Sequence, residues 1–275
     1  MSDPSVLPAG ALSGKRVALS ASESADLPRL GLSEFHCRLA IAEIGRALMI
    51  AGATVVYGGN LDRTSYTDIL IDEAQRFAGR RGVLELVLPE SEYGHLTPSE
   101  LVETRARLGE IGKLVLVRSD GMNQRLHEHR TKVHEDIDVP AALTAMRSYV
   151  SLNTNARILV GGRLTGFQGA EPGLIEEARL SSEAGAALLV AGGFGGAAAA
   201  VAGALGAYRE DDWSPSDFPL GLDSPEILLA LGRLAESTPG HEQTTPERAS
   251  LHRTLSVSHR PADIAASVVQ LLSTM

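Results

Sequence analysis

Short runs of aliphatic residues recur along the chain and predict strands that are buried on both faces. None of these runs alternates strictly between apolar and polar residues, and continuous apolar strands are typical of parallel sheets covered on both sides. We therefore expect a sheet of mostly parallel strands. The runs lie at 16–20, 54–57, 83–88, 114–118, 157–160 and 187–190, with a further candidate at 253–257.

Segments with helical spacing of apolar residues alternate with the predicted strands. Ser33 is suited to cap a helix that runs to about Ile50, with Cys37, Ile41 and Ile44 on one face. Further helices are predicted at 67–78, 98–109, 140–151, 172–184, 195–205, 225–235 and 261–272. This alternation predicts an α/β fold, an open, mostly parallel sheet with helices on both faces. We expect one domain over residues 15–275, preceded by a flexible arm over residues 1–14.

Composition narrows the classes of protein to which the chain could belong. Hydrophobic residues make up 44% and charged residues 21% of the 275 residues, which suits an ordinary globular domain. The net charge of −9 disfavours nucleic acid and anionic membranes as partners. The single cysteine excludes an intramolecular disulfide and indicates a reducing, cytoplasmic compartment. The uncharged stretch at 184–207 is rich in alanine and glycine, so we interpret it as strand, turn and helix rather than a membrane span.

Loops that follow four predicted strands carry small or glycine residues. In open α/β sheets, ligands bind beyond the carboxyl ends of the strands, where helix starts offer free N–H groups to anions. A plain tight turn or a solvated loop explains the first two loops about as well. The glycine density of the third, in which Arg163 could grip a phosphate, is harder to explain in this way. The candidate ligand-binding residues are Ser20, Ser22, Gly58, Gly59, Asn60, Gly161, Gly162, Arg163, Gly173, Glu176, Gly192 and Gly193.

Two common kinds of site are disfavoured by spacing. The glycine turn at 192–196 has Gly-x-Gly spacing but lacks the full dinucleotide fingerprint, and no Walker-type lysine is found. A P-loop ATPase, a common kinase and an ordinary dehydrogenase are therefore disfavoured. His127, His129 and His134 do not have the spacing of metal ligands on one helix face, so we expect no metal and no resident cofactor.

Arg147 lies on or beside the apolar stripe of its predicted helix. It follows Leu143 by four positions and precedes Val150 by three. A buried guanidinium needs an acidic partner or an anionic ligand. An ion pair with an acid such as Glu177 and a role in catalysis both remain open.

The order and spacing of these motifs resemble the SLOG superfamily. The matching residues are Tyr57-Gly58-Gly59-Asn60, then Arg147, then a glycine loop that ends Pro172-Gly173-Leu174-Ile175-Glu176-Glu177. The superfamily includes the Lonely Guy phosphoribohydrolases and sensor domains related to the N-terminal region of melastatin-type channels. The later Gly-Gly-Phe-Gly-Gly turn looks closer to the bacterial sensor branch. The resemblance runs from about residue 15 to 205.

The resemblance implies a Rossmann-like domain that binds a nucleotide or an NAD-derived signal such as ADP-ribose. In the hydrolase branch, an arginine and a glutamate help to cleave an N-glycosidic bond, and they match Arg147 and Glu177 here. The leading Pro-Gly-Gly and the threonine of the hydrolase motif are absent, which disfavours hydrolysis of a nucleoside monophosphate. Our hypothesis is a ligand sensor. A nucleotide N-glycosidase using Arg147 and Glu177, and a structural subunit with a vestigial pocket, are the alternatives.

A sensor must pass its signal on. We therefore expect either a homo-oligomer or a separate effector protein as its partner, besides the small nucleotide-derived ligand.

Overall fold

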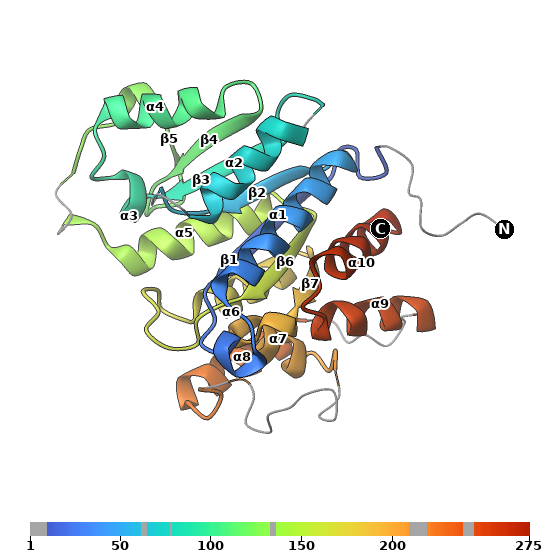
Figure 1. The fold of residues 1–275 in the computed structure, drawn as a ribbon. Coiled ribbons are helices and arrows are strands. Elements are labelled where there is room, and N and C mark those ends of the chain that lie inside the picture. The colour runs from blue at the N-terminus through green and yellow to red at the C-terminus, as the bar shows by residue number, and fades with distance from the viewer. Residues whose placement is uncertain are drawn as a thin grey trace.

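The computed structural model describes residues 10–61, 65–77, 79–132, 136–208, 219, 221–238 and 245–275. Within them the chain folds around one seven-stranded sheet, and the predicted α/β class is confirmed (Figure 1). The strands are β1 (Arg16–Ser22), β2 (Thr54–Gly58), β3 (Leu84–Pro89), β4 (Gly112–Val117), β5 (Asn123–Gln124), β6 (Ala156–Gly161) and β7 (Ala187–Ala191). The helices are α1 (Glu34–Ile50), α2 (Tyr66–Phe77), α3 (Glu90–Tyr93), α4 (Pro98–Leu108), α5 (Val139–Leu152), α6 (Gly173–Glu183), α7 (Gly196–Ala204), α8 (Pro225–Ser237), α9 (Pro246–Val257) and α10 (Pro261–Ser273).

The strand order β5-β4-β3-β2-β1-β6-β7 is that of an open doubly wound sheet. Every neighbouring pair is parallel except β4 with β5, which is antiparallel. Along the chain, the strands from β1 to β5 extend the sheet in one direction, and β6 then pairs with the other side of β1. The β1–β6 boundary is therefore the point where the winding reverses.

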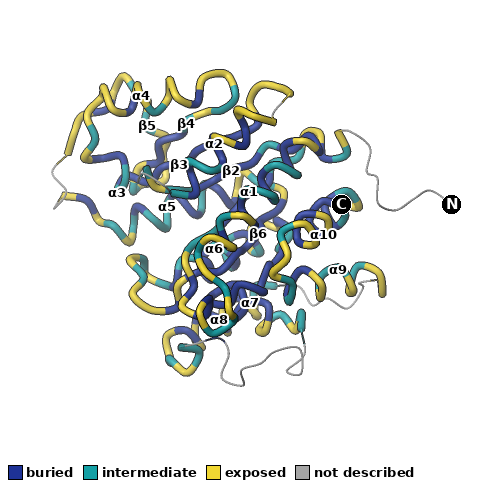
Figure 2. Tube along the Cα trace, in the orientation of Figure 1, coloured by how far each residue is buried: buried dark blue, intermediate teal, exposed yellow. Residues whose placement is uncertain are grey.

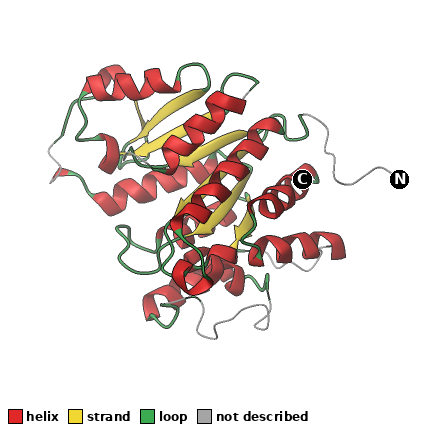
Figure 3. Cartoon of the chain, viewed as in Figure 1, coloured by secondary structure: helices red, strands yellow, loops and turns green. Residues whose placement is uncertain are grey.

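Helices cover both faces of the sheet, and the strands between them are buried (Figures 2 and 3). One face packs Val17, Leu19 and Ile158 against α1, α2 and α10 in the largest core cluster. The intervening strand residues face α5 to α8, with Ala18 against α5 and Leu159 against α6. This two-sided burial is the physical reason why the strands are continuously apolar.

Most predicted elements are present, and three details differ. The predicted strand at 253–257 is wrong, because these residues lie in α9. The two-residue β5 and the short α3 were not predicted. Within the predicted flexible arm, Leu12 is fully buried and its N–H donates to the Ala51 carbonyl over 2.8 Å, so the inner end of the arm is packed. Residues 1–9 lie outside the described part of the chain.

None of the helices in the described ranges has both the length and the apolar character that crossing a membrane requires.

Candidate functional site

The carboxyl ends of β1 and β6 lie side by side where the winding of the sheet reverses. Ser22 of β1 is in register with Gly161 of β6. The chain leaves β1 towards α1 on one face and leaves β6 towards α6 on the other. Open α/β sheets bind ligands at the edge where the loops part in this way. We call this place the β1–β6 crevice, a name for its position in the topology of the sheet.

The turn after β6 brings three backbone segments together at the crevice. The Gly162 N–H donates to the Ser22 carbonyl over 2.9 Å, and the Gly162 carbonyl accepts from the Ala197 N–H over 3.0 Å. Gly161 and Gly162 have φ values of 64° and 102°, which residues with a side chain rarely adopt. A Cβ on Gly161 would lie 2.6 Å from the Ser22 carbonyl oxygen. These two glycines therefore allow the loops after β1 and β6 to meet.

The turn after β2 lies one strand away from the crevice. A Cβ on Gly58 would lie 2.6 Å from the Met146 sulfur on α5, so this glycine lets the helix approach the strand end. Thr67 of α2 donates its hydroxyl hydrogen to the Asn60 carbonyl over 2.7 Å. Asn60 is exposed at the same sheet edge. Gly59, between them, is half-buried against Tyr57 and Thr67.

Arg147 packs against the start of α6. A Cβ on Gly169 or on Gly173 would lie 2.6 or 2.7 Å from guanidinium nitrogens of Arg147, so the two glycines make room for this group. The Arg147 guanidinium pairs with Glu176, which also accepts from the Thr144 hydroxyl over 2.6 Å. The Nε of Arg147 is buried without a hydrogen bond in the described structure, and a Glu177 carboxylate oxygen lies 3.5 Å from it.

A second buried arginine, Arg157 of β6, completes this cluster. Its guanidinium donates to Glu177 over 2.8 Å, to Ser20 over 2.7 Å and to Ser181 over 2.6 Å. A weaker bond of 3.1 Å reaches Ser151 of α5. Burial lowers the pKa of Arg157, and the Glu177 carboxylate opposes that shift. We call these two arginines, Glu176, Glu177 and the hydroxyl groups that bind them the arginine–glutamate network.

The network gives several predicted site residues a structural partner. Ser20 binds Arg157, and the pairing of Arg147 with acids of α6 agrees with the ion-pair alternative from the sequence. Arg157 itself was missed. The signal was available, because a charged residue inside a strand buried on both faces must find a partner.

Arg163 lies at the rim of the crevice, on the loop after β6. Its guanidinium pairs with Glu23 of the loop after β1 over 2.6 Å, and both side chains are more than half exposed. The pair links the two loops across the mouth of the crevice. Exposed pairs of this kind are weak and exchange readily, so the guanidinium can turn to an anionic ligand.

The turn after β7 is filled by the protein itself. The N–H of Gly196 at the start of α7 donates to the buried Asp26 carboxylate over 2.7 Å, so a carboxylate already occupies this helix start. A Cβ on Gly192 would lie 2.5 Å from the Ser256 carbonyl oxygen, and one on Gly193 would overlap that of Ser258. Both glycines are buried beneath the end of α9. They have a packing reason to lack a side chain, and a ligand contact there stays a prediction.

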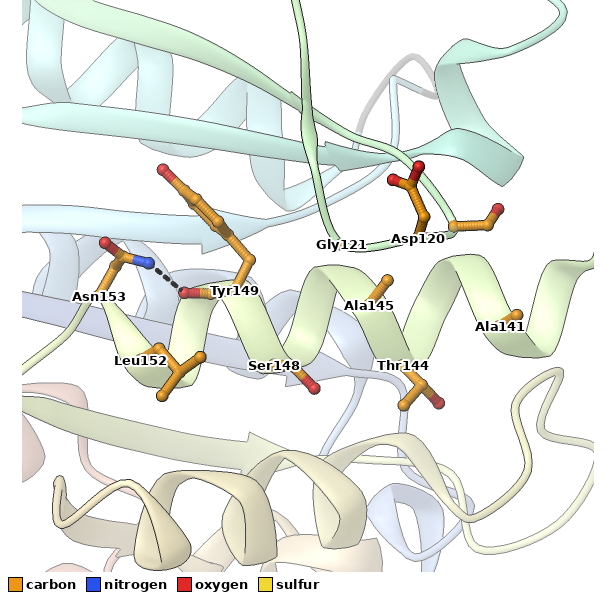
Figure 4. Close-up of a pocket in the computed structure, with 10 residues that line it drawn as sticks. Asp120, Gly121, Ala141, Thr144, Ala145, Ser148, Tyr149, Leu152 and Asn153 are labelled. Atoms are coloured by element: carbon orange, nitrogen blue, oxygen red, sulfur yellow. Dashed lines mark hydrogen bonds between the residues drawn. The ribbon is translucent and has the colours of Figure 1, made fainter.

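A groove runs along the outer side of α5 and borders the network (Figure 4). Its volume is about 480 Å³, and residues 119–121 form its other wall. Figure 4 shows Tyr149 on one side of the helix and Thr144, Ser148 and Leu152 on the other. Thr144 lines the groove and also binds Glu176. The Thr144 side chain therefore links the groove to the network.

A smaller cavity of about 230 Å³ lies at the carboxyl ends of β3 and β4, and we call it the β3–β4 cavity. Glu90 in its wall is buried, and its carboxylate accepts from Lys132 over 2.5 Å and from the Ser119 N–H over 2.8 Å. Burial raises the pKa of Glu90, but the hydrogen bonds from Lys132 and Ser119 outweigh burial and lower the pKa to about 2. Glu90 is therefore a carboxylate at neutral pH.

The lowered pKa of Glu90 predicts a pH dependence of stability. The carboxylate stabilises the fold above its ordinary pKa of 4.5, and this contribution is lost as the pH falls through about 2. We expect the Glu90→Gln variant to be less stable than wild type near neutral pH and the difference to shrink towards pH 2. Urea unfolding at a series of pH values measures this. A difference that did not change with pH would contradict the prediction.

Comparison with known proteins places the chain in a family. A search of curated proteins and a search of solved structures returned no match. The family model described as SLOG cluster2 matches residues 11–215, which include the β1–β6 crevice, both arginines of the network and the start of α6. Because this match covers well over half of the 275 residues, the chain belongs to the SLOG family.

Proposed function

We propose that this domain binds a nucleotide-derived ligand such as ADP-ribose at the β1–β6 crevice and acts as a ligand sensor. Membership of the SLOG family supports a nucleotide-related function. The crevice joins the loops after β1 and β6, and its Gly162 lies against Leu174 in the first turn of α6. Pro172, which precedes that helix, makes no side-chain cap, so the first N–H groups of α6 are suited to a phosphate.

The ion pairs of Glu176 and Glu177 are the observation that favours a sensor over a hydrolase. A glycosidase needs a carboxylate that reaches the anomeric carbon or its attacking water. Glu176 is held by Arg147 and Thr144, and Glu177 is held by Arg157. Their side chains are only 3% and 13% exposed. Carboxylates that are buried in this way and bound to guanidinium groups serve as supports better than as nucleophiles or bases.

In this proposal, the ligand's phosphates bind the start of α6 and the Arg163 guanidinium at the rim. The sugar lies over the glycine turn at Gly161 and Gly162, and Ser22 and Asn60 offer polar groups at the neighbouring strand ends. The signal then passes to a second copy of the chain or to a separate effector protein.

A thermal-shift panel of nucleotides, NAD and ADP-ribose tests the proposal. A ligand that binds only the native state raises the melting temperature with its concentration. We expect such a shift for wild type and an affinity about tenfold lower for Arg163→Gln, because a charge-assisted hydrogen bond to phosphate is lost. Arg81→Gln is the matched control. Arg81 is also exposed, at 79% against 58% for Arg163, and it is ion-paired with Glu110, but it precedes β3 and so lies at the amino ends of the strands.

Two outcomes would contradict the proposal. Absence of any shift across the panel would favour a structural subunit. Equal loss of affinity in Arg163→Gln and Arg81→Gln would mean that the ligand does not bind at the crevice.

A further inference from the structure

The β3–β4 cavity lies apart from the crevice at which we propose nucleotide binding. It lies at the ends of β3 and β4, whereas the crevice lies between β1 and β6, on the far side of β2 in the strand order. Its volume of about 230 Å³ is below the range of roughly 300–1,000 Å³ that is typical of pockets for drug-sized ligands. The cavity therefore suits a small molecule rather than a whole nucleotide.

The unpaired hydroxyl group of Tyr93 is the first observation that indicates a ligand site in this cavity. Tyr93 is 2% exposed and lines the cavity, and its hydroxyl has no hydrogen-bond partner in the part of the chain that the structure describes. Buried polar groups nearly always have a partner, because leaving one unsatisfied costs its desolvation free energy. An aromatic edge contact with His129, with ring centroids 5.6 Å apart, holds the Tyr93 ring in place.

The neighbouring carboxylate does not meet this need. One oxygen of Glu90 accepts from Lys132 over 2.5 Å. The other accepts from the Ser119 N–H over 2.8 Å and from its hydroxyl over 2.6 Å. Glu90 is thus occupied by other donors and its charge is balanced by Lys132. The Tyr93 hydroxyl is left free to donate to something else.

The charges around the cavity favour an anion. Arg118 pairs with Asp120 over 2.8 Å, as Lys132 pairs with Glu90. Arg130 donates to the His129 carbonyl over 2.8 Å and has no carboxylate partner among the described residues. Glu128, the other acid of the lining, pairs with Arg125 over 3.5 Å, so the Arg130 charge is the one in the lining that no described carboxylate balances. A buried hydroxyl donor and an exposed, unbalanced guanidinium that line the same cavity match the oxygen atoms of a phosphate or carboxylate.

We propose that the β3–β4 cavity is a second ligand site, which takes a small oxyanion through the Tyr93 hydroxyl and the Arg130 guanidinium. The shared chemistry is that of a phosphate or a carboxylate group on a small molecule. The site is independent of the proposed nucleotide site, since none of its residues belongs to the crevice or to the arginine–glutamate network.

Calorimetric titration with inorganic phosphate and, separately, with succinate tests this site. We expect one of the two anions to bind wild type, and the binding to weaken about tenfold in Tyr93→Phe and in Arg130→Gln. Tyr149→Phe is the matched control, because this tyrosine lines the α5 groove instead. The anion that binds distinguishes a phosphate ligand from a carboxylate ligand.

Two further measurements show that any loss of anion binding in Tyr93→Phe is not caused by unfolding and that the anion does not bind at the crevice. Tyr93→Phe should melt at the same temperature as wild type or higher, because it removes a hydroxyl that has no partner. Arg163→Gln, which should weaken nucleotide binding, should leave the oxyanion titration unchanged. The inference is overturned if neither anion binds, if Tyr93→Phe binds as tightly as wild type, or if crystals grown with phosphate show only a water molecule bound to the Tyr93 hydroxyl.

Discussion

Replacing Arg157 with methionine should lower the free energy of unfolding by about 3–5 kcal/mol, because it leaves the largely buried Glu177 carboxylate with only the Arg147 guanidinium, 3.5 Å away. Arg157 is 2% exposed and donates to Glu177, Ser20 and Ser181. Methionine fills a similar volume but donates nothing, so these three acceptors lose a common donor. Urea unfolding followed by circular dichroism measures the loss.

Two controls decide whether burial causes this effect. Arg163→Met removes an ion pair of similar length, 2.6 Å, whose side chains are more than half exposed, so it should cost at most about 1 kcal/mol. The double variant Arg157→Met with Glu177→Leu should recover part of the loss, because it also removes the stranded carboxylate. Equal costs for Arg157→Met and Arg163→Met would show that water reaches the network.

Replacing Gly193 with alanine should lower the free energy of unfolding by about 3 kcal/mol or more. The new Cβ would overlap the Ser258 carbonyl oxygen and approach the His259 nitrogen. Both are backbone atoms, so no side-chain rotation relieves the overlap, and the cost should lie at or above the upper end of the about 1–3 kcal/mol that is typical of overpacking. We expect the end of α9 to leave β7, which hydrogen exchange in residues 246–257 would detect.

The control for Gly193→Ala is Gly232→Ala in α8. Nothing lies within 4 Å of a Cβ at Gly232 and its φ is not positive, so alanine should raise stability by up to about 1 kcal/mol. Together, the two variants separate a packing role of Gly193 from a general effect of substituting a glycine. Normal stability of Gly193→Ala with loss of ligand binding would instead favour the predicted ligand contact.

The sheet was predictable because strands that are buried on both faces have continuous runs of apolar residues in the sequence. A run such as Ile158-Leu159-Val160 has no exposed face, so each residue must be apolar. The predicted strand at 253–257 failed because its only apolar residues are Leu255 and Val257, and so short a segment does not distinguish a strand from a half-buried helix. Only Leu255 and Ser256 of α9 are buried. The start of that helix was marked by Thr245, whose hydroxyl accepts from the Arg248 N–H.

The placement of the glycine turns at the ends of the strands was predictable, but the pairing of the charged side chains was not. Glycines that follow strands indicate the ligand edge of the sheet, and Arg147 was expected to need an acid. Which acid pairs with which arginine depends on how α5 and α6 pack over β6. The spacing of residues along the chain does not reveal this packing. In the structure, Arg147 forms its closest ion pair with Glu176, and Arg157 forms an ion pair with Glu177. The same packing of distant elements covers Gly193 with the end of α9.

Sensing without turnover is tested most directly by incubating the purified protein with ADP-ribose, measuring binding by calorimetry, and analysing the recovered ligand by chromatography. A sensor whose acids are held in the arginine–glutamate network predicts saturable binding with ADP-ribose recovered intact. Release of free adenine by wild type, abolished in Glu177→Gln, would contradict it and assign the domain to N-glycosidic bond cleavage.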